Sequence, residues 1–306
     1  MVRLGLAIGM RRVLVVGAGI DGLVTAVKNH LAGNRVIILE QRATIGGRGT
    51  SSSSHGFQLE HGPHLLLKGG PLHKMVKKVS RVKLSLRPVR PQKIKIVGHG
   101  MLWPINSPRK ILALKRGEDP IRESALKLIS AWGLDIPIRE KALLNGNLCV
   151  VGEGWAGIVG RLASTLEEVG VPIQTNTEVA EVIDGGVLLS TGVKVEADEV
   201  HLCQGNKKSD SIFVSTLDMV LDYQPLAGLH GMIDGDVAIL DLAAIHSGKA
   251  PGMSHLSCIS LTGGLDAIER LLDERVSGWR THILVKRENK HISLACQKKT
   301  LSDGLV

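Results

Sequence analysis

A short apolar strand, a glycine-rich turn, a helix and a second strand that ends on an acid follow one another between Arg12 and Glu40. The first apolar run, up to Val16, is rich in β-branched residues, which is typical of a buried parallel strand. The turn reads Gly-Ala-Gly-Ile-Asp-Gly over residues 17–22, and apolar residues then recur at helical spacing up to Leu31. A dinucleotide-binding βαβ unit requires this order, and the sequence therefore predicts such a site.

The residues of this unit have separate physical tasks. Gly17 permits the tight turn, Gly19 lets the backbone approach a pyrophosphate, and Gly22 lets the helix pack closely on the strand. The start of the helix, at Ile20, offers unpaired N–H groups and the positive end of its dipole to the phosphates. Glu40 can accept hydrogen bonds from a ribose diol, and its charge disfavours a 2′-phosphate.

A second glycine motif, Gly46-Gly47-Arg48, follows the acid, and Gly62-Pro63 comes further on. With these motifs the chain resembles the superfamily of flavin amine oxidases, protoporphyrinogen oxidases and phytoene desaturases. The resemblance implies FAD as the cofactor, with Gly46, Gly47 and Arg48 around the pyrophosphate and flavin side. A planar guanidinium suits phosphate oxygens because it can bind them in bidentate fashion. The alternative is a surface arginine on a glycine turn.

Asp21 departs from the pattern of that family, in which small residues are usual at this position. An acid in the first turn of a helix is favoured by the helix dipole, but it would repel a pyrophosphate if it pointed inward. We therefore expect Asp21 to point away from the ligand.

Residues 152–157 also fit G-x-G-x-x-G and precede a helical pattern, so a second nucleotide site is one interpretation. Against it, the next strand ends without an acid, and the redox-active cysteine pair of two-nucleotide reductases is missing. The family resemblance gives the interpretation we favour. It implies a structural glycine turn here, followed by a segment from Asn176 in which the backbone of Val179 contacts the adenine end of FAD.

The predicted fold is α/β, with a Rossmann-like FAD-binding domain built on a central parallel sheet. A smaller α+β substrate domain with a mixed or antiparallel sheet completes it. We assign residues 1–80 and 146–206, with 293–306, to the FAD-binding domain, and residues 81–145 and 207–292 to the substrate domain. The resemblance further implies a C-terminally truncated member, because the sequence ends at Val306 without the Gly-Asp segment and final helix of the family.

Several elements outside the nucleotide unit can be predicted from periodicity. Residues 65–78 and 263–276 have the amphipathic pattern of helices. Residues 93–97 alternate apolar and basic side chains and lead into a hairpin with 101–104, and residues 187–195 form a second hairpin. Two candidate edge strands are 283–286 and 292–295.

Charge is unevenly distributed along the chain. Between His61 and Gly117 there is no Asp or Glu, against fourteen Lys and Arg. This basic segment is interpreted as a solvated face, as a peripheral contact with acidic lipid, or as a site for phosphorylated substrates or nonspecific nucleic acid. Only seven residues are aromatic, which argues against specific nucleic-acid stacking and against an aromatic cage for an amine.

Other features limit the location and the chemistry. The four cysteines lie far apart, the histidines show no metal-ligand spacing, and no apolar run is long enough for a membrane span. We expect a cytoplasmic protein, with membrane association only through the basic region 68–116, and no metal.

The resulting functional prediction is an FAD-dependent oxidoreductase that removes hydride from a small hydrophobic or isoprenoid-like substrate. The resemblance names no catalytic side chain. A non-catalytic dinucleotide-binding relative is one alternative. An NAD-dependent reductase is another, although Gly46-Gly47-Arg48 speaks against it.

Overall fold

The computed structural model describes residues 10–60, 65–79, 83–103, 119–130, 145–203, 212–247 and 249–294. The chain folds into two compact units, each formed by two segments of the sequence. The first unit comprises residues 1–50 and 157–206, and the second comprises 51–156 and 207–306. Gly62-Pro63, the residues at the C-terminal end and parts of the basic region, 80–82 and 104–116, lie outside the described residues.

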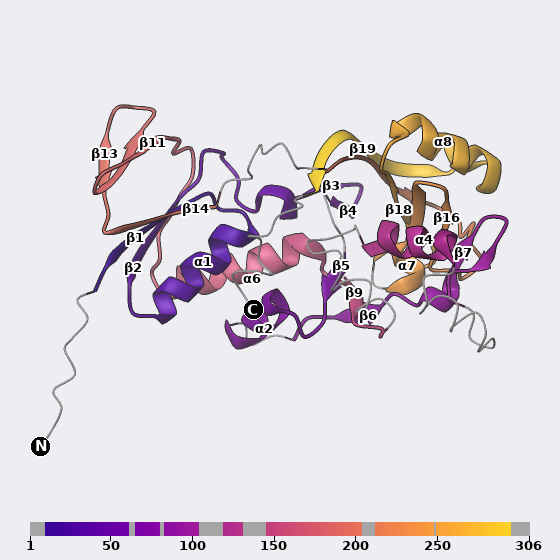
Figure 1. The fold of residues 1–306 in the computed structure, drawn as a ribbon, viewed down its shortest axis with the longest axis horizontal. Helices are drawn as coiled ribbons and strands as arrows, with labels where there is room; N and C mark the ends of the chain where they lie inside the picture. The colour runs from indigo at the N-terminus through magenta and orange to yellow at the C-terminus, as the bar shows by residue number, and fades with distance from the viewer. Residues whose placement is uncertain are drawn as a thin grey trace, which may run out of the picture. The chain divides into compact units, whose positions relative to one another are not determined.

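The first unit is built on a parallel sheet with the strand order β10-β2-β1-β14. Strands β1, β2 and β14 of this sheet are labelled in Figure 1. Its elements are β1 (Arg12–Val16), α1 (Ile20–Leu31), β2 (Arg35–Leu39), the 3₁₀ turn η1 (Gly47–Gly49), most of α6 (Gly154–Glu168), β10 (Ile173–Gln174), β11 (Val179–Ile183), β12 (Gly186–Leu189), β13 (Lys194–Glu196) and β14 (Glu199–Leu202).

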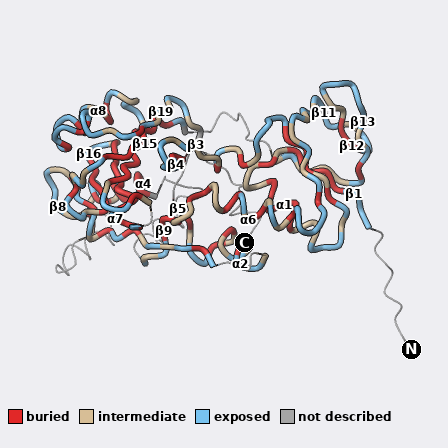
Figure 2. The backbone as a smooth tube through the Cα atoms, turned by 180° about the vertical axis from the view of Figure 1, so that it is seen from behind, coloured by how far each residue is buried: buried red, intermediate tan, exposed pale blue. Residues whose placement is uncertain are grey.

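Both faces of this parallel sheet are covered, and β1 is buried along its length except at its first residue (Figure 2). Val15 faces α1, where it lies against Gly22. The opposite face, with Leu14 and Val16, packs against Val187 of the antiparallel sheet β11-β12-β13. Burial on both faces explains why the strand is a continuous apolar run instead of an alternating one.

The second unit contains a seven-stranded mixed sheet, β19-β15-β18-β17-β16-β7-β8, in which only the pairing of β16 with β7 is parallel. The elements of this unit are β3 (Ser51–Ser54), β4 (Phe57–Glu60), β5 (Leu65–Leu67), α2 (Pro71–Val79), β6 (Leu86–Pro88), η2 (Pro91–Lys93), β7 (Ile94–Ile96), β8 (Gly100–Met101), α4 (Pro120–Ser130), β9 (Leu148–Val151), β15 (Ile212–Leu221), β16 (Gly231–Asp234), β17 (Val237–Asp241), α7 (Leu242–Ile245), β18 (Ser254–Ser260), α8 (Gly264–Arg275), η3 (Trp279–Thr281) and β19 (Ile283–Leu294).

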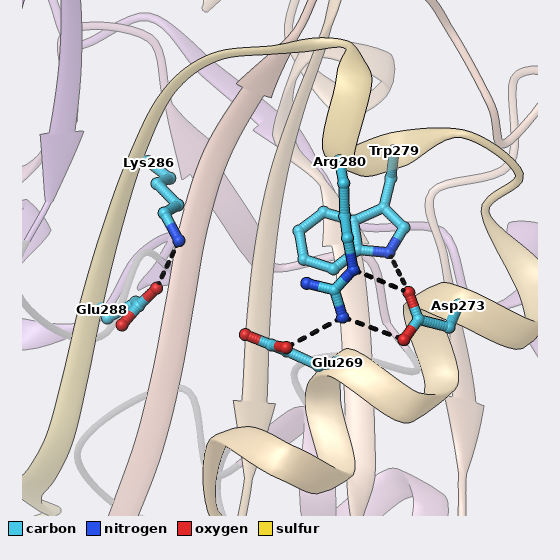
Figure 3. A network of polar contacts seen from close by, with 6 residues as sticks. All are labelled: Glu269, Asp273, Trp279, Arg280, Lys286 and Glu288. Atoms are coloured by element: carbon cyan, nitrogen blue, oxygen red, sulfur yellow. Dashed lines mark hydrogen bonds and ion pairs between the residues drawn. The ribbon is translucent and has the colours of Figure 1, made fainter.

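Helices cover the mixed sheet on both faces. On one face, Leu217 and Met219 of β15 pack with Leu271 of α8 and with the buried indole of Trp279. On the other face, α4 and α7 contribute Ile129 and Leu242 to a second apolar cluster. Arg280 lies over the Trp279 ring and pairs with two acids of α8, which holds η3 against the helix (Figure 3).

The predicted fold class is confirmed: an α/β chain with one parallel sheet and one mixed sheet. The mixed sheet has seven strands against four in the parallel sheet, so the second sheet is the larger one. The compact units also divide the chain differently from the predicted domains, because they place residues 51–80 and 146–156 in the second unit. Strand β9 of the second segment pairs with β5 of the first and with β6 of the second unit, which explains the difference. The boundaries given above for the FAD-binding and substrate domains stay a prediction.

Candidate functional site

The glycine turn after β1 has the geometry that close packing of α1 demands. Gly17 has φ +105°, and its N–H donates to the carbonyl of Leu39 at 2.8 Å, which ties the turn to the end of β2. A Cβ atom on Gly22 would lie 1.8 Å from the carbonyl oxygen of Gly17. Only glycine therefore fits at position 22, and its role is to allow the contact between helix and strand.

Gly19 differs from Gly22 because nothing lies within 4 Å of the place that its Cβ would take. The residue precedes the first turn of α1, and no side chain caps the helix at this position. The positive end of the helix dipole thus faces open space beside a backbone that a ligand can approach closely. Ile20 begins the helix at this point.

Glu40 is held at the carboxyl end of β2. Its side chain is buried, with one carboxylate oxygen accepting from the N–H of Ala18 at 2.7 Å and the other from the N–H of Arg42 at 2.9 Å. The first bond joins the acid to the glycine turn. Each carboxylate oxygen has a second lone pair, so both can still accept a bond from a ribose hydroxyl.

The second glycine motif, which is distant in sequence, packs against the first. The N–H of Gly46 donates to the carbonyl of Ala18 at 2.8 Å, and Gly46 forms a parallel bridge with Gly19. A Cβ on Gly47 would lie 3.4 Å from the Cα of Gly19, and both Gly46 and Gly47 have positive φ. The fold thus places Arg48 next to the start of α1, as a phosphate site requires.

Asp21 interacts electrostatically with Arg48, and the expectation that its carboxylate points away from the ligand stays a prediction. Burial raises the pKa of the Asp21 carboxyl, and the positive charge of Arg48 opposes that shift. Burial also lowers the pKa of Arg48, and Asp21 opposes that shift. Part of Arg48 is nevertheless exposed to solvent.

Val179 lies at the start of β11, close in sequence to a loop that reaches the end of β2. In that loop, Thr177 donates its N–H to the carbonyl of Glu40 at 2.8 Å. Val179 packs on the cluster that contains Leu39. The structure therefore brings the segment of Val179 to the same sheet edge as Glu40, although a contact with adenine stays a prediction.

Periodicity did not identify Cys203 or Thr25, which also lie near this edge. Cys203 follows β14, the strand next to β1, and its Sγ lies 3.7 Å from the hydroxyl of Thr25 in α1. Burial raises the pKa of this thiol, and the charge of Asp21 raises it further, while the contact with Thr25 opposes the shift. Cys203 could have been identified from its position at the carboxyl end of a predicted strand, because ligands of parallel sheets bind at the carboxyl ends of strands.

The second G-x-G-x-x-G sequence, at 152–157, does not present an open helix start. The carboxylate of Glu60 accepts from the N–H of Trp155 and from Nζ of Lys249, each at 3.0 Å. A Cβ on Gly154 would lie 1.7 Å from that carboxylate. A buried protein acid thus occupies the place where a phosphate would bind, as the structural interpretation of this turn requires.

Two further observations on the described residues concern metal binding and membrane spans. No group of three or more His, Cys, Asp and Glu among them is placed to hold a metal ion. In the same parts of the chain, no helix is both long and apolar enough to cross a lipid bilayer.

Comparison with known proteins agrees with this geometry. A model of the NAD(P)-binding Rossmann-like domain family matches residues 15–79, which include the glycine turn, Glu40 and Arg48. The match covers the start of the chain, where the predicted dinucleotide site lies.

Solved structures with the same fold extend over most of the chain. A protein from Pyrococcus furiosus is 19% identical with a TM-score of 0.70, over 91% of this chain and 88% of its own. An oxidoreductase from Methanosarcina mazei is 18% identical with a TM-score of 0.64, over the same shares. A putrescine oxidase with redesigned cofactor binding is 16% identical with a TM-score of 0.63, over 91% of this chain and 84% of its own. The predicted resemblance to oxidoreductases of the amine oxidase type is therefore confirmed at the level of the fold.

Proposed function

We propose that this chain binds FAD at the start of α1 and is an oxidoreductase that removes hydride from a small hydrophobic or isoprenoid-like substrate. One observation carries the proposal: the open helix start, the buried acid of β2 and the Gly46-Gly47-Arg48 turn meet at one edge of the parallel sheet. The N–H of Gly46 and the N–H of Ala18 bind them together through bonds of 2.8 Å and 2.7 Å.

The residues present fit the nucleotide half of FAD. The open space at Gly19 admits a pyrophosphate that any larger side chain would obstruct. The fixed carboxylate of Glu40 accepts bonds from the ribose of the adenosine, and Arg48 binds phosphate oxygens. The Val179 backbone would contact the adenine. When bound, the flavin supplies the acceptor for hydride, and the protein supplies binding, orientation and electrostatics.

The composition of the chain bears on the substrate class. With seven aromatic residues in 306, the chain has few rings with which to surround a substrate amine. The low aromatic content therefore favours a lipid or isoprenoid over an amine. A non-catalytic dinucleotide-binding protein with the same site is the main alternative, and an NAD-dependent reductase is the second.

The test is to purify the protein without added cofactor, record its visible absorbance, and identify any ligand released by denaturation. Titration with FAD and with NAD follows, using Arg48→Gln and the control Arg42→Gln, an exposed arginine of the loop between β2 and η1. We expect FAD to bind, R48Q to weaken binding about tenfold or more, and R42Q to leave it unchanged.

The alternatives give different results. Bound FAD that no lipid or amine reduces supports the non-catalytic protein, and preference for NAD supports the reductase. A folded, colourless protein that takes up neither dinucleotide contradicts the proposal.

We also propose that the basic region 68–116 contacts acidic lipid from a cytoplasmic location. Its described part includes α2, in which Leu72 and Val76 are buried while Lys74, Lys77 and Lys78 are exposed. Cations grouped in this way attract anionic headgroups by about 1 kcal/mol each near the surface. Sedimentation with vesicles tests this: binding to phosphatidylserine vesicles at low salt, absent with phosphatidylcholine, is expected. Equal sedimentation with both lipids contradicts it.

A further inference from the structure

We propose that Ser85 and His246 form a nucleophile–base pair that cleaves small carboxylic esters by acyl transfer through Ser85. Both residues belong to the second compact unit, whereas the predicted dinucleotide-binding residues belong to the first. This activity is separate from the proposed oxidoreductase function and does not depend on it.

The two side chains are in direct contact. Ser85 Oγ lies 2.9 Å from Nε2 of His246, the hydrogen-bond distance between a serine nucleophile and its base. Ser85 is exposed, so a small substrate can reach its hydroxyl from solvent, whereas His246 is buried. The two residues are 161 positions apart in the sequence. The fold therefore creates the pair, and no local spacing predicts it.

The backbone of Ser85 is held on both sides by the turn that precedes α6. Its carbonyl accepts from the N–H of Gly152 at 2.8 Å, and its N–H donates to the carboxylate of Glu153 at 3.4 Å. These bonds continue the antiparallel pairing of β6 with β9, in which Leu86 is the partner of Val151. A nucleophile that is fixed in this way needs little reordering before it reacts.

Gly152 provides the space in which the imidazole approaches the serine. A Cβ on Gly152 would lie 2.7 Å from Nε2 of His246 and 3.2 Å from Cβ of Ser85. Any larger residue would therefore push the ring away from the hydroxyl. Gly152 is the first glycine of the second G-x-G-x-x-G sequence, which the dinucleotide site does not use. We assign it as a positioning residue for this pair.

The groups around His246 favour its neutral form, which a general base requires. Burial lowers the pKa of the His246 ring, and the positive charges of Arg87 on β6 and of Lys249 after α7 lower it further. A hydrogen bond with its own backbone and the charge of Glu153 oppose this shift. Lys249 is itself paired with the buried carboxylate of Glu60 at 3.0 Å. In the neutral tautomer that carries its proton on Nδ1, Nε2 accepts the proton of the Ser85 hydroxyl.

The proposed reaction needs only the ester and water. Ser85 Oγ forms a bond to the carbonyl carbon of the ester while His246 Nε2 takes the hydroxyl proton. The bond from that carbon to the alkoxy oxygen then breaks, and the alcohol leaves with the proton. Water attacks the acyl-serine in the same way, which releases the carboxylic acid and restores Ser85. The positive charge of Arg87, two residues along the chain, favours the oxyanion of each step.

The experiment uses p-nitrophenyl acetate as the substrate and a fluorophosphonate, which loses fluoride to an attacking hydroxyl, as the covalent probe. Wild type is compared with Ser85→Ala, His246→Gln, Gly152→Ala and the control Ser277→Ala, an exposed serine of the same unit. We expect wild type and S277A to hydrolyse the ester and to be labelled at Ser85, as located by peptide mass mapping. S85A should lose both reactions, and H246Q and G152A should slow both by about a hundredfold or more.

The pH profile separates a base from a structural histidine. Because the base must be neutral, the wild-type rate should rise with pH through a pKa below the ordinary histidine value of about 6.5 and then level off. H246Q should lose this inflection.

Circular dichroism and urea denaturation establish which variants are folded. If folded wild type is not labelled at Ser85, or if folded S85A hydrolyses the ester as fast as wild type does, the inference is overturned. Ser85 is exposed, so S85A should fold even if substitution of the buried histidine prevents folding. Neither result bears on the proposed dinucleotide site, which the FAD titration tests.

Discussion

Two glycines of one turn, three residues apart, have opposite surroundings. Gly22 has a backbone oxygen 1.8 Å from its missing Cβ, whereas Gly19 has open space at the same position. The first glycine serves the packing of α1, and the second keeps space for a ligand. The difference separates a folding role from a binding role within one motif.

Alanine substitution at each position tests this separation. We expect Gly22→Ala to destabilise the protein by several kcal/mol, because backbone must move to relieve the clash. Gly19→Ala should cost only about 1 kcal/mol as a changed helix cap, since its φ of −70° suits any residue. The affinity of G19A for FAD should nevertheless fall by about tenfold or more.

Urea denaturation and FAD titration of both variants give the two measurements. A G19A protein that binds FAD as wild type does would show that the open space at residue 19 is not used by the ligand. A stable G22A protein would contradict the close approach of α1.

At the scale of elements, α8 and the short turn η3 show that a buried ring and exposed charges contribute differently to stability. Trp279 is 2% exposed, and its Nε1 donates to Asp273 at 2.8 Å. Arg280 pairs with Glu269 and Asp273 at 2.9 Å each, but half of its side chain is exposed (Figure 3). Exposed pairs contribute little because water screens them and the side chains lose conformational freedom.

We expect Trp279→Ala to lower the free energy of unfolding by about 3–5 kcal/mol, through the cavity it leaves beside Leu271. Arg280→Ala should cost much less, since it removes exposed ion pairs and one cation–π contact. Urea denaturation of both variants measures the difference. If both variants lost a similar free energy of unfolding, burial of the Trp279 ring would not be the larger contribution.

Elements with a local signal were predictable. The helix expected at 263–276 is α8, the hairpin at 187–195 is β12–β13, and 93–97 pairs with the strand after it as β7–β8. The two edge strands predicted within 283–295 are one long strand, β19, at the edge of the mixed sheet. The helix predicted over 65–78 is wrong at its start. Leu65–Leu67 is a strand because it pairs with β9, a partner distant in sequence, and Gly69-Gly70 then interrupts the chain before α2.

In the candidate site, too, some residues have a local signal in the sequence and others do not. Spacing predicted Gly17, Gly19, Gly22 and Glu40, because a βαβ unit determines where each one lies. Gly46, Gly47 and Arg48 came from the family resemblance. Spacing did not predict that Glu60 caps α6, since this contact joins distant parts of the chain. Long-range contacts of this kind depend on the packed fold and have no local pattern.

At the scale of the whole molecule, every predicted cofactor-binding residue belongs to the first compact unit, formed by residues 1–50 and 157–206. A ligand that binds only the folded form stabilises by about 2.7 kcal/mol at a concentration of 100 Kd. ADP contains the ribose and pyrophosphate but no flavin, so it should contact this unit alone. Its effect on backbone protection therefore reports where the nucleotide half binds.

Hydrogen exchange with and without ADP tests this assignment. We expect slower exchange in the first turn of α1, at the end of β2 and in residues 46–50, because these backbone groups surround the pyrophosphate. The Arg48→Gln variant should lose most of this protection at the same ADP concentration. Peptides from β15 and β18 serve as the internal control, since they belong to the second unit. Protection confined to those strands, or centred on the turn at 152–157, would place the nucleotide elsewhere and contradict the site at Gly19.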